Sequence, residues 1–288
     1  MKILLFGGTG QLGLEIKKRA EDLNFEVISP VISEVDITDG QQLSFLGRRV
    51  KPQLVINCAA YTDVDKAEAE PDLAFAINAA GSRNVALLCR ELNCRLIHIS
   101  TDFVFDGTQS APINEQQPTN PISIYGKTKL EGEREILEQW AAASLIVRTS
   151  SLHGARGGNF VHTMLKLFAE REVVRVVNDR TMSATWAGWL AEAILDLGRL
   201  KATGIVHASC AGALTWFDFA SAIKEQVQGK IPNVARLKLE AVSSEAFSLP
   251  APRPKYSVFD CTHLTGLLGR SPISWREGLN SHLKELGY

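Results

Sequence analysis

Short apolar runs alternate with longer amphipathic segments along the first half of the chain. The run at residues 3–6 is continuously apolar, as is typical of a strand buried on both faces of a parallel sheet. Further strands are predicted at 25–29, 53–57, 95–100 and 144–148. Apolar residues at helical spacing predict helices over 11–22, 72–92 and 126–140. This alternation of strands and helices predicts an α/β fold with a doubly wound parallel sheet.

The pattern changes after residue 150. A glycine-rich stretch leads to a predicted helix at 159–170 and a strand at 173–177. A loop at 249–256 holds three of the eleven prolines and precedes a last amphipathic helix. We therefore expect one lobe from residues 1–150, to which part of 173–200 returns. The second lobe, 151–288, is expected to be smaller and interleaved with the first.

Composition narrows the class of protein. Of the 288 residues, 45% are hydrophobic and 22% charged, which is ordinary for a globular chain, and no apolar run approaches the ~18 residues of a membrane span. The net charge of −1 disfavours nucleic acid as a partner. Five scattered cysteines without a C-x-x-C pair indicate reduced thiols, and six scattered histidines lack metal-ligand spacing. We expect a soluble cytoplasmic protein with no metal site.

Three glycines directly after the first strand carry the first functional signal. They lie at the spacing G-x-x-G-x-x-G, and a helix follows. Such glycines allow positive φ and close approach of the backbone to a diphosphate, which the N-terminus of the helix attracts. The position of this loop in a strand–turn–helix unit predicts a Rossmann-type dinucleotide site. We assign to it Gly7, Gly10, Gln11, Leu12 and Gly13.

The cofactor preference follows from the end of the second predicted strand. An acidic residue there would bind the ribose 2′-hydroxyl of NADH, but the chain reads Val-Ile-Ser-Pro at 27–30. NADPH and NADH both remain open, and the missing carboxylate favours NADPH. Asp36 and Ile37 are candidates to flank the adenine, although Asp36 also fits a helix cap. Ala59 and Ala60 follow the third strand, where small residues allow either close cofactor approach or plain packing.

A tyrosine and a lysine provide candidate chemistry. Tyr125 and Lys129 lie at positions i and i+4 near the start of a predicted helix, on one face. A phenol has a pKa of about 10, and a nearby ammonium lowers it toward the range of a useful proton donor. Ser100, Thr101 and Asp102 stand at the carboxyl end of a strand, the edge where such sheets bind ligands. Together with the glycine loop, this arrangement favours catalysis on a carbonyl group over a surface pair.

The chain resembles the extended short-chain dehydrogenase/reductases, which share a Thr/Ser–Tyr–Lys triad, and within them the dTDP-4-dehydrorhamnose reductase family. The matching stretches are G-G-T-G-Q-L-G at 7–13, N-C-A-A-Y-T-D-V-D-K-A-E at 57–68, S-T-D-F-V-F-D-G at 100–107, P-I-S-I-Y-G-K-T-K-L-E-G-E at 121–133, R-T-S at 148–150, G-N-F-V at 158–161, V-N-D at 177–179, T-W-F-D-F-A at 215–220 and R-P-K-Y-S at 253–257. They extend over most of the chain.

The resemblance implies a fold, a reaction and site residues. Residues 1–150 would form the NAD(P)-binding domain and 151–288 the substrate lobe. NADPH or NADH would reduce the 4-keto group of a dTDP-linked 6-deoxy sugar. Tyr125 would be the acid, Lys129 would hold the nicotinamide ribose and lower the pKa of Tyr125, and Thr101 would assist. Tyr61 and Thr62 would join the cofactor site.

The substrate site is expected to include Thr101, Asp102, Ser151, Asn159 and Arg253. An arginine suits the diphosphate of a nucleotide sugar, although a solvated loop charge is an open alternative for Arg253. For Asn159 a helix cap is the alternative to a nucleotide contact.

Several positions depart from the family pattern. Ser151 stands where the family usually has a tryptophan against the sugar, and residues 180–185 read R-T-M-S-A-T instead of Q-x-G-x-P-T. Of the glutamates that bridge a magnesium-dependent dimer in some members, Glu15 matches, while Gly188 stands near a second. We therefore expect an altered sugar pocket and a monomer or weak homodimer.

Three other functions are compatible with this fold. A dehydratase is disfavoured because Phe103, and not a glutamate, follows Asp102. A nucleotide-sugar epimerase needs only the triad and stays possible. A non-catalytic regulatory subunit, as in the methionine adenosyltransferase β subunit, has no need for an intact Thr101, Tyr125 and Lys129.

Overall fold

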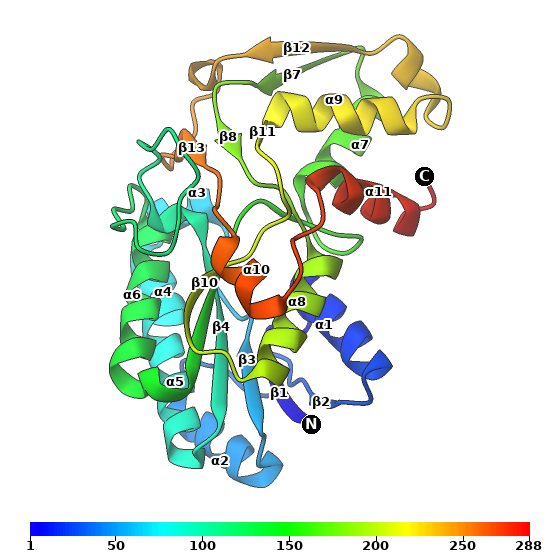
Figure 1. Ribbon diagram of the computed structural model, residues 1–288. Coiled ribbons are helices and arrows are strands. Elements are labelled where there is room, and N and C mark those ends of the chain that lie inside the picture. The colour runs from blue at the N-terminus through cyan, green and yellow to red at the C-terminus, as the bar shows by residue number, and fades with distance from the viewer.

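A six-stranded parallel sheet forms the centre of the computed structural model, which describes residues 1–288 (Figure 1). Its strand order is β10-β5-β4-β3-β1-β2. The strands are β1 (Lys2–Phe6), β2 (Glu26–Ile28), β3 (Leu54–Asn57), β4 (Arg95–Thr101), β5 (Ser144–Thr149) and β10 (Gly204–His207). The order reverses next to β1, where a doubly wound sheet opens a crevice for ligands. The predicted α/β class and parallel sheet are confirmed.

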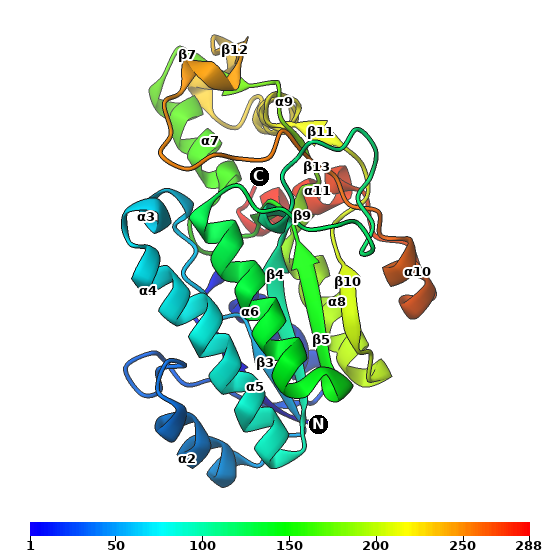
Figure 2. The same ribbon diagram turned by 90° about the vertical axis from the view of Figure 1, so that its left-hand side faces the viewer.

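Alternating side chains of the strands supply the cores on the two faces of the sheet. Ile3 and Leu5 of β1 pack on one face with α1 (Gln11–Asp22) and α8 (Ala187–Leu200), whereas Leu4 and Phe6 pack on the other. That second face is covered by α2 (Gly40–Val50), α5 (Gly81–Leu92) and α6 (Ile124–Trp140). Figure 2 shows α4 (Pro71–Phe75), α5 and α6 across the near face.

Some predicted elements differ in their bounds. The helix expected over 72–92 consists of α4, a π-helical segment at Ala76–Ala80 and α5. The second strand is shorter than expected, and α6 begins two residues earlier, at Ile124. The helices α2, α3 (Val64–Ala69) and α8 and the strand β10 were not predicted individually. Strand β10 pairs with β5, so the chain returns to the main sheet after α8.

Most of the remaining elements lie at the upper end of the sheet in Figure 1. The helices are α7 (Phe160–Glu170), α9 (Trp216–Val227), α10 (Thr262–Leu268) and α11 (Trp275–Glu285). Strand β7 (Val173–Val177) pairs in parallel with β12 (Lys238–Val242). The short strands are β6 (Leu152–His153), β8 (Thr181–Met182), β9 (Thr185–Trp186), β11 (Leu214–Thr215) and β13 (Tyr256–Ser257). Apolar residues of α7 and α9 belong to the same core cluster as α1 and α8. No helix combines the length and the apolar character needed to cross a membrane.

Candidate active site

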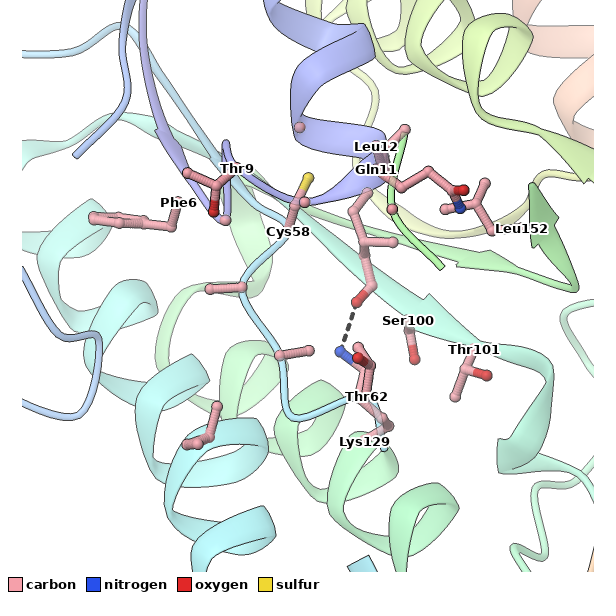
Figure 3. Close-up of a pocket in the computed structure, with 18 of the residues that line it drawn as sticks. Phe6, Thr9, Gln11, Leu12, Cys58, Thr62, Ser100, Thr101, Lys129 and Leu152 are labelled. Carbon is pink, nitrogen blue, oxygen red and sulfur yellow. Dashed lines mark hydrogen bonds between the residues drawn. The ribbon is translucent and has the colours of Figure 1, made fainter. Parts of the chain in front are cut away.

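A cavity of about 740 Å³ opens at the carboxyl ends of β1, β3 and β4, where the strand order reverses. Figure 3 shows Thr62, Ser100, Thr101 and Lys129 gathered on one side of it, with Gln11 and Leu152 on another. Its lining combines the glycine loop, the segments after β2, β3 and β4, the first turns of α6 and residues 149–158. A cavity of this volume accommodates a small-molecule ligand.

The glycine loop leads directly into the amino-terminal end of α1. Gly7 has φ +74°, and a Cβ there would lie 2.5 Å from the Ala59 nitrogen. A Cβ on Gly13 would lie 2.3 Å from the Gly7 carbonyl oxygen. Both positions therefore require glycine. Gly10, the N-cap of α1, makes no side-chain capping bond, so the first-turn N–H groups are available to an anion. Gly7, Gly10, Gln11, Leu12 and Gly13 all line the cavity, as predicted.

The segment after β2 forms another wall. Ser29 packs against the glycine loop, since a Cβ on Gly8 would lie 1.8 Å from the Ser29 hydroxyl oxygen. Asp36 and Ile37 line the cavity. Asp36 accepts the Thr38 N–H at 2.8 Å, while Asp39 caps α2. Asp36 is thus not the helix cap that its sequence also allowed.

The segment after β3 is held by Asn57, whose Oδ1 accepts the Ala59 N–H at 3.1 Å, and by Asn78. Ala59, Ala60 and Thr62 line the cavity. Tyr61 does not belong to the lining, because its hydroxyl donates to Glu70 at 2.6 Å. The Asn78 amide accepts the Tyr61 N–H at 2.8 Å and donates to the Thr128 hydroxyl on α6 at 2.9 Å. Asn78 was missed by the sequence analysis; its only signal is a polar residue in an otherwise apolar stretch.

Tyr125 stands in the first turn of α6, which Ser123 caps through the Gly126 N–H at 3.1 Å. A Cβ on Gly126 would lie 2.2 Å from the Phe103 carbonyl oxygen, so glycine lets the helix approach the end of β4. Burial raises the pKa of Tyr125 to about 12, although a hydrogen bond with Thr101 works in the opposite direction. This is the reverse of the lowering expected from Lys129, because burial outweighs the other influences.

Lys129 lies one turn further along α6 and is 2% exposed. Its Nζ donates to the Ile99 carbonyl at 2.7 Å, the dashed line in Figure 3. Burial lowers the pKa of Lys129 to about 8, and Glu133 opposes that shift. Glu133 is itself bound by Arg148 at 2.9 and 2.6 Å, and the Ser100 hydroxyl donates to it.

Asp102 and Ser151 also line the cavity. Asp102 accepts from Ser150 at 2.9 Å and from Thr101 at 3.1 Å, and burial raises its pKa. Ser151 lines the cavity with its backbone in the left-handed region, at φ +45°. Four of the predicted site residues, Thr101, Asp102, Tyr125 and Ser151, therefore lie together.

Two predicted substrate residues are not in the lining. Asn159 caps α7 through the His162 N–H at 3.2 Å and donates to the Gln11 side chain at 2.8 Å. Arg253 forms a bidentate pair with Asp65 at 3.1 and 2.8 Å, which lowers the pKa of Asp65. Asn159 thus reaches the cavity only through Gln11, and the charge of Arg253 is already paired with Asp65.

Acidic and histidine side chains do not assemble into a metal site, since no three His, Cys, Asp or Glu residues meet in a metal-binding group. The Glu15 carboxylate is bound by Arg19, which also contacts Glu192 at 3.0 Å. The side chain of Arg19 fills the space beside Gly188, where a Cβ would lie 2.4 Å from its guanidinium.

These residues define what the cavity can do. The glycine loop and the open first turn of α1 suit a diphosphate, and the gap at Gly7 is too narrow for any other residue. At the other end, a protonated phenol stands beside a threonine hydroxyl and a buried lysine. A proton donor next to a dinucleotide site is the arrangement needed for reduction of a carbonyl group.

Comparison with known proteins agrees with this geometry. The family model described as RmlD substrate binding domain matches residues 1–288. The spore coat polysaccharide biosynthesis protein SpsK of Bacillus subtilis (strain 168) is 37% identical over 99% of this chain and 97% of its own length.

Two solved structures are similar over nearly the whole chain. A dTDP-4-dehydrorhamnose reductase from Clostridium acetobutylicum is 39% identical, with a TM-score of 0.94 and coverage of 100% of both chains. A dTDP-4-dehydrorhamnose reductase from Bacillus anthracis in complex with NADP is 36% identical, with a TM-score of 0.93 and coverage of 99% of both chains.

Proposed function

The chain belongs to the family described as RmlD substrate binding domain, and from this we propose that it is an NAD(P)H-dependent oxidoreductase that reduces dTDP-4-dehydrorhamnose to dTDP-rhamnose. The observation that carries the proposal is the meeting of Thr101, Tyr125 and Lys129 at one end of a cavity whose other end is a glycine loop. The cofactor is NADPH or NADH, with NADPH favoured by the absence of an acidic residue at the end of β2.

The residues present fit a dinucleotide. Gly7, Gly10 and Gly13 leave the space that a diphosphate needs, and the N–H groups of Gln11 and Leu12 stand in the open first turn of α1. Asp36 and Ile37 would hold the adenosine end, and Ala59, Ala60 and Thr62 the segment toward the nicotinamide ribose, which Lys129 would bind. When bound, the nicotinamide supplies the hydride.

Proton transfer is the task of Tyr125. Its phenol is protonated at neutral pH because burial keeps its pKa high, so it can donate to the carbonyl oxygen as negative charge develops there. The Thr101 hydroxyl lies beside it and would bond to the same oxygen. A protonated Lys129 would stabilise the phenolate that remains.

The sugar nucleotide is expected on the side of Asp102 and Ser151. Arg253 would reach its diphosphate from the proline-rich loop by exchanging its ion pair with Asp65 for the phosphate oxygens. The same loop packs against Gly107, where a Cβ would lie 2.5 Å from the Lys255 nitrogen. Asn159 would act by orienting Gln11. We propose residues 1–150, with the later return through α8 and β10, as the cofactor domain and the rest of 151–288 as the substrate lobe.

We also propose a cytoplasmic location, which the five unpaired cysteines support. A monomer or weak homodimer is supported by the pairing of Glu15 with Arg19, which leaves this carboxylate engaged within the chain.

A panel of dTDP-, UDP- and GDP-linked 4-keto sugars, incubated with NADPH and with NADH, tests the proposal. We expect stoichiometric oxidation of NADPH with the dTDP-linked 6-deoxy-4-keto sugar and slower or no reaction with the UDP- and GDP-linked ones. Conversion of a sugar without net cofactor oxidation would instead identify an epimerase, and no conversion of any sugar would contradict both activities.

A further inference from the structure

Three buried polar side chains form a continuous chain beneath the cavity. Asn57 ends β3, His98 stands opposite it in the register of β4, and Lys129 reaches them from α6. None is more than 2% exposed. The Asn57 Nδ2 lies 3.2 Å from His98 Nδ1, and His98 Nε2 lies 3.3 Å from Lys129 Nζ. The role of His98 does not follow from the reduction chemistry described above.

The orientation of the Asn57 amide is set by the backbone. The Ala59 N–H points at Oδ1 at 3.1 Å, and because an N–H group only donates, the atom facing it must be the amide oxygen. The amide nitrogen Nδ2 then faces His98 Nδ1. Since Nδ2 also only donates, Nδ1 must accept and carries no hydrogen.

The tautomer of His98 fixes the state of its neighbour. A neutral imidazole without a hydrogen on Nδ1 carries it on Nε2, so Nε2–H donates toward Lys129. An ammonium has no lone pair to accept that bond, whereas an uncharged amine has one. The amine then donates one of its own hydrogens to the Ile99 carbonyl at 2.7 Å. The hydrogen bonds that join Asn57, His98, Lys129 and the Ile99 carbonyl can all form only when Lys129 is uncharged.

We propose that His98 is a positioning residue, which in the cofactor-free protein stabilises the uncharged form of Lys129 relative to the ammonium through a hydrogen bond from Nε2–H, with Asn57 fixing the tautomer. Charging Lys129 takes up one proton from solvent. The proton of His98 must then move from Nε2 to Nδ1, and the Asn57 amide must turn away from Ala59. The inference concerns the same site as the proposed function and rests on it for its kinetic readout only.

The surrounding charges are compatible with this state. Burial alone is the largest influence on His98 and lowers its pKa well below the usual range, so the ring is neutral whether or not Lys129 is charged. Burial lowers the pKa of Lys129 to about 8, so the uncharged amine predominates only above that pH. The groups that face Lys129 are Glu133 and Tyr125 on its own helix and Cys58 after β3. Glu133 is paired with Arg148 of β5, so its charge is shared.

Nuclear magnetic resonance of the free protein tests the tautomer without any substrate. With ¹⁵N-labelled histidine, the resonances of His98 are identified by their loss in His98→Phe. We expect the hydrogen on Nε2 and a bare Nδ1 at pH 9. A hydrogen on Nδ1 would overturn the proposal whatever reaction the enzyme performs, so this result and a failure of the proposed function are distinguishable.

The pH profile of kcat/KM for NADPH tests the effect on Lys129, because this constant reports groups of the free enzyme. The wild type should lose activity on the alkaline side as Lys129 loses its proton. In Asn57→Asp, a carboxylate accepts from both Ala59 N–H and His98 Nδ1–H, which frees Nε2 to accept from an ammonium. The alkaline limb should move upward by about one pH unit or more.

A double variant separates this route from a simple charge effect. In the His98→Phe background, Asn57→Asp has no imidazole to act through, so the alkaline limb should stay where His98→Phe alone puts it. An equal upward shift in both backgrounds would overturn the proposal, because the carboxylate would then act on Lys129 through space. An unchanged limb in Asn57→Asp alone would overturn it as well.

Discussion

Tyr125 is the residue on which the proposed chemistry depends most directly. Its position follows from two local features, the Ser123 cap and the close approach that Gly126 allows to Phe103. Burial makes the phenol a weak acid in the free protein. Reduction needs the phenol protonated at the start, so a raised pKa is compatible with the proposed role. The same raised pKa means that the phenolate left after proton transfer is less stable.

Tyr125→Phe should reduce turnover by about 10²-fold or more, the usual contribution of a positioned proton donor. The ring and its edge contact with Phe103, at 5.5 Å between centroids, would remain, so the cofactor affinity should change little. Turnover and the NADPH dissociation constant are the measurements. Near-normal turnover would remove Tyr125 from the mechanism.

Ser151→Trp tests the sugar pocket, since Ser151 lines the cavity where the family usually has an indole. The left-handed backbone at φ +45° already carries a Cβ, although it is less favourable for a bulky side chain than for serine. An apolar wall should raise the preference for dTDP-4-dehydrorhamnose over other dTDP-4-keto sugars by about fivefold, equivalent to about 1 kcal/mol.

Ser151→Asn is the matched control, because asparagine tolerates the same backbone region and adds no apolar surface. The ratio of kcat/KM values for the sugars should stay near the wild-type ratio in this control. The same ratio in the tryptophan variant would show that Ser151 does not contact the sugar.

At the scale of elements, local signals were sufficient for some segments only. The bounds of α1 agree with the prediction because a glycine turn precedes it and its buried residues follow helical spacing. In contrast, α2 contains Gly47, although glycine is a poor helix former. Glycine is needed there because a Cβ would lie 2.5 Å from the Leu88 side chain of α5. Helix α8 is buried on most sides, and its charged residues Glu192, Asp196 and Arg199 form only a narrow polar stripe. Tertiary packing decides both.

The same distinction applies to the site. Tyr125 and Lys129 were predicted from their spacing, whereas Thr101 was singled out from residues 100–102, at the end of a strand, by the family resemblance. Asn78 and His98 were not predicted as site residues, because their hydrogen-bond partners Thr128 and Lys129 lie far away in the sequence and no local motif marks these positions.

Ser29→Asp tests the role of the segment after β2 in choosing the cofactor. Ser29 packs against Gly8 in the glycine loop, so a carboxylate at position 29 would repel the 2′-phosphate of NADPH. NADH has no such phosphate, and its binding should not change. The ratio of kcat/KM for NADPH to that for NADH should fall by at least about tenfold, or about 1.4 kcal/mol. Ser29→Asn is the neutral control of similar size. Equal ratios in the two variants, or a strong wild-type preference for NADH, would refute this placement.

At the scale of the whole molecule, the two proposed lobes share one apolar core. Residues of α7 and α9 pack into the cluster that also holds α1, α8 and one face of the sheet. Unfolding of either lobe would therefore expose the core of the other, and we expect a single cooperative transition.

Acid should destabilise the protein through its buried histidines. Burial lowers the pKa of His207 to about 3 and that of His282 to about 4, and that of His98 and His153 well below the usual 6.5. Below pH 6.5 the unfolded chain binds protons that the folded chain does not. The free energy of unfolding therefore decreases as the pH is lowered, by up to about 1.4 kcal/mol per pH unit for each histidine.

Chemical denaturation at pH 5, 6, 7 and 8 checks this expectation. The free energy of unfolding should change little between pH 7 and 8 from these groups and fall steeply below pH 6. His207→Asn, which retains a donor for the Ile113 carbonyl, should flatten the acid slope. Equal stability at pH 5 and 7 would contradict the assignment of neutral buried rings.

The central claim is that hydride passes from the nicotinamide to C4 of a dTDP-linked keto sugar. The most direct measurement uses NADPH carrying deuterium at C4 of the nicotinamide, on each face in turn, with dTDP-4-dehydrorhamnose and mass spectrometry of the product. We expect one of the two labelled cofactors to place a single deuterium on C4 of a dTDP-rhamnose product, with one NADP⁺ formed per sugar. A product without label from both cofactors, or a sugar left unreduced, would contradict the account.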